Sequence, residues 1–130
     1  PVALLREWSE TALMALTEWQ RAVDAALSQR ASIQTKDRER KLKETYLRLQ
    51  IADLEAAQEK RVNQDWREAQ FVLLCSNDDE HAQLTTEIEL ARGAVQLADA
   101  NAERAREMAH LYRTMIGTLG ALAGSFPPGY

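Results

Sequence analysis

The sequence predicts an all-α protein of long helices that pack against one another as in a coiled coil. After Pro1 there is no proline before Pro127 and no glycine before Gly93, whereas β-rich and α/β folds need frequent turns. Strong helix formers (Ala, Leu, Glu, Arg and Gln) dominate the composition. With 130 residues, we expect a single helical domain with three helices in an up-down-up arrangement.

The first helix is predicted from about residue 2 to about residue 31. Its apolar residues recur every three or four positions, which places them on one stripe of a helix. The stripe consists of Leu5, Trp8, Ala12, Leu16, Trp19, Val23 and Ala26. Trp8 and Trp19 share its face, so this face is expected to pack against another element.

The second helix is predicted from about residue 36 to about residue 74, with a looser pattern that residues 58–61 interrupt. Its main stripe is predicted to contain Leu42, Tyr46, Leu49, Ala52, Ala56, Trp66, Ala69 and Leu73. Between Ser32 and Lys41 the apolar pattern nearly stops, but no proline or glycine forbids helix there. One alternative therefore remains open, in which the first two helices are fused into one long helix and the protein is a dimeric bundle.

The third helix is predicted from about residue 78 to about residue 119. Asn77 is a suitable N-cap, and Glu80 completes the pattern of a capping box. A seam with 4-3-4-3 spacing, typical of coiled coils, comprises Leu84, Ile88, Ala91, Val95, Ala98, Ala102, Ala105, Ala109, Tyr112, Ile116 and Leu119. A second stripe runs beside it through Leu90, Ala94, Leu97, Met108, Leu111, Met115 and Leu122. Residues 120–130 are predicted to be a flexible tail rich in Gly and Pro.

These patterns predict a non-catalytic structural or adaptor module that assembles with protein partners through helix packing. The expected core or interface anchors are Trp8, Trp19, Trp66, Ala98, Ala102, Ala105, Ala109 and Tyr112. Because the apolar faces of the three helices differ in width and length, we expect a homodimer or a partner helix to cover the remainder. No cofactor and no small-molecule substrate are expected.

A basic stretch between Lys36 and Arg48 suggests an alternative function, in which the module binds a lipid, RNA or filament surface. It contains six cations against three acidic residues. Mixed charges of this kind are more often a solvated helix face. Electrostatic binding would weaken steeply with salt, whereas helix packing would not.

Net charge, the length of apolar runs and the cysteine count argue against a nucleic-acid binder, a membrane-spanning protein and a disulfide-linked protein. The net charge of −4 and the pI near 5.2 do not favour a nucleic-acid binder, and no apolar run reaches the length of a membrane span. The single cysteine, Cys75, excludes an intrachain disulfide and favours a reducing compartment, so we expect an intracellular, cytoplasmic or nuclear protein. Because the chain begins at Pro1, we expect it to be a segment of a longer protein.

Three motifs contain residue types that occur in metal, thiol or peptide-binding sites. Glu107 and His110, with Glu103 one turn earlier, have the spacing of di-iron ligands, but the chain has no second Glu-x-x-His, so no metal is expected. Cys75 has no obvious histidine partner and is expected to be an ordinary half-buried thiol. Pro127, Pro128 and Tyr130 fit the Pro-Pro-x-Tyr ligands of WW domains, an interpretation kept as an alternative to a helix stop.

Overall fold

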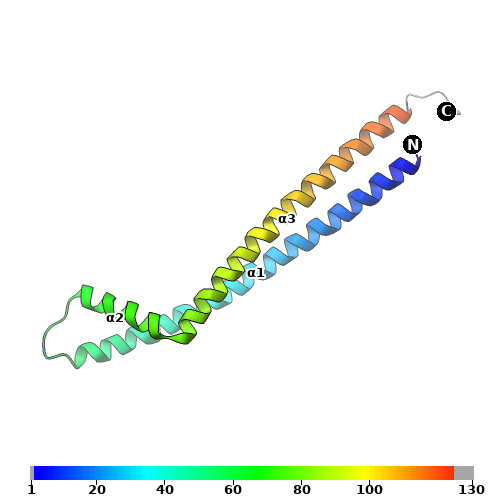
Figure 1. The fold of residues 1–130 in the computed structure, drawn as a ribbon. Coiled ribbons are helices and arrows are strands. Elements are labelled where there is room, and N and C mark those ends of the chain that lie inside the picture. Colours follow the sequence, from blue (N-terminus) through cyan, green and yellow to red (C-terminus); the bar gives the residue numbers. More distant parts are fainter. Residues whose placement is uncertain (1, 125–130) are drawn as a thin grey trace. The chain divides into compact units, whose positions relative to one another are not determined.

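The protein is entirely helical over the residues that the structure describes. The structure, a computed structural model, describes residues 2–124 and the side chains of residues 2–122. It contains α1 (Val2–Ala56), α2 (Gln64–Asn77) and α3 (Asp79–Gly124), and this range includes no strand (Figure 1). The predicted all-α class with three helices is confirmed.

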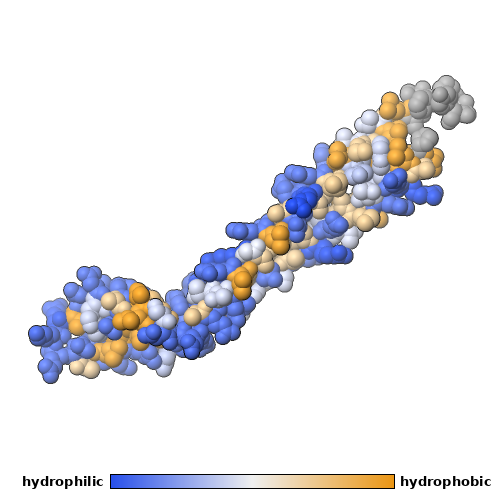
Figure 2. Space-filling model, viewed as in Figure 1, coloured by the Kyte–Doolittle hydropathy of each residue, from blue (hydrophilic) through white to orange (hydrophobic). Residues whose placement is uncertain are grey.

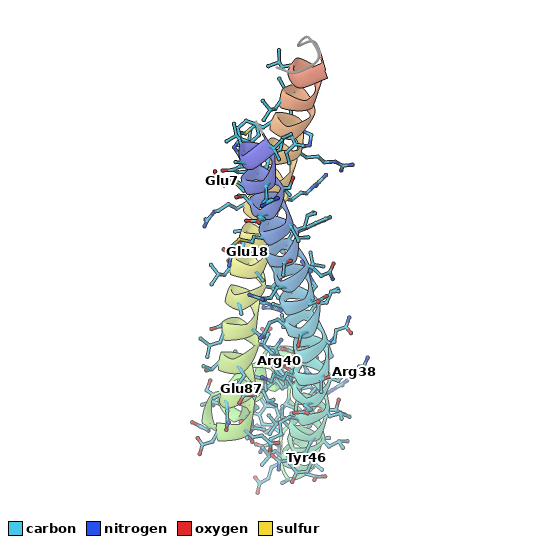
Figure 3. The ribbon with its side chains drawn as sticks, turned by 90° about the vertical axis from the view of Figure 1, so that its right-hand side faces the viewer. Glu7, Glu18, Arg38, Arg40, Tyr46 and Glu87 are labelled. Carbon is cyan, nitrogen blue, oxygen red and sulfur yellow. The ribbon has the colours of Figure 1, made fainter. Side chains whose placement is uncertain are left out.

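The chain divides into two compact units, and α1 and α3 contribute to both. Within the described range, unit 1 contains residues 2–28 and 94–124, and unit 2 contains residues 29–93. In unit 1, the beginning of α1 and the end of α3 run side by side in opposite directions (Figures 1 and 3). In unit 2, the end of α1 packs against α2 and the beginning of α3.

The predicted boundary between the first two helices, near residues 32–35, was wrong, because α1 continues without interruption to Ala56. Over this stretch the chain follows the alternative of one continuous helix. The apolar pattern lapses here because the half-buried positions carry charges that are paired. Asp37 accepts from Lys41 at 3.0 Å and from Arg40 at 3.1 Å, at helical i,i+4 and i,i+3 spacing. Arg40 also lies on the side of α1 that faces α3, where its guanidinium donates to Thr85, whereas Arg38 points away (Figure 3).

α1 ends at Ala56, and residues 57–63 connect it to α2, so the predicted start of the second helix near residue 36 was also wrong. The Asn63 side chain caps α2 by accepting a hydrogen bond from the Trp66 amide at 3.0 Å. Arg67 reaches across the connection and donates to both carboxylate oxygens of Glu55, at 2.7 and 3.0 Å. A cap and a bidentate ion pair therefore hold the two ends of this turn.

α3 begins at Asp79, close to its predicted start near residue 78, whereas α2 continues to Asn77, beyond the predicted end near residue 74. A different residue from the predicted one caps α3. Asp78, rather than Asn77, accepts the hydrogen bond from the His81 amide at 2.8 Å. Asp79 and Glu80 place negative charge in the first turn, where it interacts favourably with the helix dipole. α3 continues to Gly124, beyond its predicted end, so residues 120–124 are helix rather than tail.

The two units have different cores. The buried residues of unit 2 are mostly large: Leu47, Ile51, Leu84, Ile88 and Ala91. The buried residues of unit 1, within the described range, are all alanines: Ala15, Ala26, Ala98, Ala105 and Ala109. Alanine at the seam allows helix axes to approach to about 8 Å, but it buries little apolar area per layer.

Burial separates the two predicted stripes of α3. Every position of its predicted seam is buried or half-buried, whereas most of the second stripe is exposed. The main stripe predicted for residues 36–74 was wrong, because Leu42, Tyr46 and Leu49 are exposed while Leu47 and Ile51 are in the core. The inward face of α1 there is offset from the one that the apolar spacing indicated.

Candidate functional site

The most distinctive surface of the described chain is the set of large apolar side chains that flank the alanine seam of unit 1. Figure 2 shows apolar side chains reaching the surface on the face that it presents. In unit 1 the exposed set comprises Val2, Leu4, Leu13, Met14, Leu16, Trp19, Leu27, Leu97, Met108, Leu111 and Leu122. The fully buried positions of unit 1 thus carry alanine, whereas many of its large apolar side chains are exposed.

A first groove, of about 500 Å³, runs between α1 and α3 in unit 1. Its lining comprises Ser9, Ala12, Leu13, Leu16 and Trp19 from α1, with Arg106, Ala109, His110, Arg113 and Ile116 from α3. The α1 wall is largely apolar, whereas three nitrogen-bearing side chains form the α3 rim. This first groove therefore combines an apolar floor with one basic edge.

A second groove, of about 390 Å³, also lies between the two helices of unit 1. Its lining comprises Glu18, Arg21, Ala22 and Ala25 from α1, with Ala98, Asn101, Arg104, Ala105 and Met108 from α3. Its charges have both signs. Leu97 and Leu111 share a face of α3 with Met108 by helical spacing and are themselves exposed.

Two of the three predicted tryptophan anchors border grooves of unit 1. Trp19 lines the first groove and is 37% exposed. Trp8 is half-buried and lines a smaller depression with Met115, Leu119 and Leu122. Trp66 is half-buried at the beginning of α2, in unit 2.

The remaining predicted anchors lie on the seam of α3 in unit 1. Ala98, Ala105 and Ala109 are buried, and Ala102 and Tyr112 are half-buried. The predicted WW-domain ligand, Pro127, Pro128 and Tyr130, lies outside the described residues. Sequence reasoning missed the basic rim of the first groove, although the seven-residue spacing of Arg106 and Arg113 places both on one helix face.

The basic stretch of the alternative function is engaged in contacts within unit 2. Five of its six cations form ion pairs. Lys43 reaches Asp78 at 3.0 Å and Glu80 at 3.4 Å, and Lys36 reaches Glu87 at 3.7 Å. Arg48 pairs with Glu68 and stacks on the Phe71 ring, with its guanidinium carbon 3.8 Å from the ring centre. These pairs tie α1 to α2 and α3.

The contacts between Lys43, Asp78 and His81 also shift the pKa values of Asp78 and Lys43. The hydrogen bond from the His81 amide and the contact with Lys43 hold the pKa of Asp78 below its usual 3.8. The contact with Asp78 in turn raises the pKa of Lys43 above 10.5. Both shifts favour the charged forms, so the capped beginning of α3 is strengthened by the ion pair.

Cys75 and His81 both lie near Glu44. Cys75 is half-buried, and burial together with the charge of Glu44 raises the pKa of its thiol above 9.0, which disfavours the reactive thiolate. His81 pairs with Glu44 at 3.0 Å. No cluster of three or more His, Cys, Asp or Glu side chains suited to a metal ion occurs among the described residues, Glu103, Glu107 and His110 included.

Hydropathy gives no membrane span in this part of the chain. None of α1, α2 and α3, over residues 2–124, contains a stretch long and apolar enough to cross a bilayer.

No protein-family model, no curated protein and no solved structure matches the chain.

Proposed function

We propose that this chain is a non-catalytic structural or adaptor module that holds protein assemblies together through helix packing on unit 1. The observation that carries the proposal is the inverted distribution of side-chain size in that unit. Its buried positions are alanines, while Leu13, Leu97 and Leu111 remain more than half exposed.

Energetics favour covering these side chains. Fully burying one leucine side chain stabilises a protein or complex by about 1.5–3 kcal/mol relative to leaving it exposed. An alanine layer contributes much less because it removes little apolar area from water. A packed helix that covers several leucines therefore gives a larger free-energy gain than the existing seam gives per layer. A second copy of the chain or a helix of another protein supplies such a surface.

The alternative, a basic surface for lipid, RNA or a filament, has weaker support. Its cations mostly have carboxylate partners inside unit 2, and an external anion would have to displace those carboxylates. Leu13, Leu97 and Leu111 of unit 1, by contrast, are more than half exposed. Assembly through unit 1 is therefore the function that the geometry favours.

Photo-crosslinking at neighbouring positions of α3 tests this proposal. A photoreactive phenylalanine analogue replaces either Leu97 or Gln96, which are both exposed but point in directions about 100° apart. On irradiation, the analogue at position 97 should join a second polypeptide, whereas the analogue at position 96 should react mainly with water. Equal crosslinking at both positions, or none at either, would contradict the proposal.

A further inference from the structure

The first groove of unit 1 has two unlike walls. On α1, Leu13, Leu16 and Trp19 are 65%, 45% and 37% exposed and line the groove. They occur at helical spacing, so they present a continuous apolar strip to whatever lies in the groove. Such a strip with a half-exposed tryptophan is the surface that an amphipathic helix covers in helix-in-groove recognition.

The α3 wall carries two arginines, Arg106 and Arg113. Arg106 and Arg113 are seven residues apart, about 10 Å along the helix, and His110 lies between them on the same wall. Neither arginine forms an ion pair or side-chain hydrogen bond with a described residue. Most cations of unit 2, by contrast, have carboxylate partners.

Acidic neighbours do not change this picture. Glu103 and Glu107 line a separate depression, which shares Arg106 and His110 with the first groove. The lining of the first groove itself contains no Asp or Glu. Packing this groove against the same groove of a second copy would therefore leave its arginines without carboxylates. The groove is not its own complement.

We propose that the first groove binds an amphipathic helix of another protein, whose apolar row is flanked by carboxylates about seven residues apart. Leu13, Leu16 and Trp19 contact the apolar row of that helix. Arg106 and Arg113 pair with its carboxylates and set its orientation and register. The inference rests on the proposed function and identifies the chemistry of one partner.

Peptide binding to the whole chain tests the inference. Two fluorescein-labelled synthetic helical peptides share one leucine row at i, i+3 and i+7 and differ only at the flanking positions, which carry Glu in one and Lys in the other. Fluorescence anisotropy should show the Glu peptide binding roughly 3- to 30-fold more tightly than the Lys peptide, the range expected for two partly exposed ion pairs. Added salt should reduce this preference.

Charge reversal on the rim identifies the site. The double substitution Arg106→Glu and Arg113→Glu should make the Lys peptide the tighter ligand. Arg104→Glu, on the same helix but lining the second groove, should leave the order unchanged. Leu16→Asp should weaken both peptides. If circular dichroism shows that the double reversal unfolds the helices, the neutral pair Arg106→Gln and Arg113→Gln should abolish the preference.

The outcomes separate this inference from the proposed function. Binding of neither peptide, equal binding of both, or a preference that survives charge reversal would overturn the inference. Light scattering on the same variants reports assembly independently. If the wild-type chain associates and Arg106→Glu with Arg113→Glu abolishes that association, a second copy occupies this groove and the inference is wrong. If association is intact in the double variant, the proposed function is unaffected, and the peptide preference alone decides the inference about the first groove.

Discussion

Ala26 is the position where an enlarged side chain tests the close approach of α1 and α3 most severely. It is 2% exposed and, unlike Ala98, Ala105 and Ala109, it borders neither groove of unit 1. A larger side chain at Ala26 therefore has no adjacent groove into which it can turn. Ala26→Met keeps a good helix former while adding a flexible thioether chain at the seam.

The expected cost follows from overpacking. Inserting extra atoms into a close-packed core costs about 1–3 kcal/mol, which lowers the melting temperature of a chain of this size by roughly 3–15 °C. Ala100→Met is the matched control, because Ala100 is exposed on α3 in the same unit, and surface substitutions usually change stability by less than about 0.5 kcal/mol.

Thermal unfolding followed by circular dichroism near 222 nm measures both variants. We expect a clear fall in melting temperature for Ala26→Met and almost no change for Ala100→Met. A melting temperature of Ala26→Met equal to that of the wild type would refute close packing of the alanine seam in unit 1. An equal fall in both variants would mean that the effect comes from methionine rather than from the seam.

Three further predictions concern unit 2. Gly93→Ala should raise the free energy of unfolding in urea by about 1 kcal/mol, because an added Cβ meets nothing within 4 Å and alanine is the better helix former; a loss of stability would show a hidden contact. The lowered pKa of Asp78 gives stability that is present above pH 3.8 and lost as the pH falls below it, so Asp78→Asn should lose less stability than the wild type between about pH 6 and pH 2.5, and equal losses would refute the contribution. Cys75, whose thiol pKa is raised above 9.0, should react with Ellman's reagent at about pH 8 more slowly in the folded chain than in urea, and equal rates would show an exposed thiolate.

The helical class and the seam of α3 could be predicted because both depend on local signals. The absence of internal proline and the regular spacing from Leu84 to Leu119 depend on the chain's own periodicity. In the structure every position of that seam is buried or half-buried. The start of α3 near residue 78 could be predicted from its acidic residues and a candidate capping side chain, although the residue that caps the helix is Asp78.

The continuity of α1 could not be predicted because its inward face there is polar. Lys36, Arg40 and Lys43 occupy half-buried positions, and their partners lie far away in the sequence or one helical turn away. The apolar spacing is therefore interrupted at these positions, although ion pairs hold them in the folded chain. The end of α1 was equally hidden, since residues 58–61 resemble the charged run that remains helical.

The grooves of unit 1 depend on the pairing of two distant helices and were visible only in part. Trp8 and Trp19 were singled out because aromatic side chains at helical spacing indicate a contact face. The basic rim at Arg106 and Arg113 acquires meaning only when α1 places its leucines opposite. The sequence alone places those two arginines on one helix face and does not indicate what that face adjoins.

The molar mass of the purified chain tests the central claim, that unit 1 assembles with another helix, most directly. Static light scattering over a roughly tenfold range of concentration should give a mass that rises above 14.7 kDa, because association is favoured by mass action. Addition of a partner helix should raise the mass at low concentration as well. A mass that stays at 14.7 kDa under all these conditions would contradict the account.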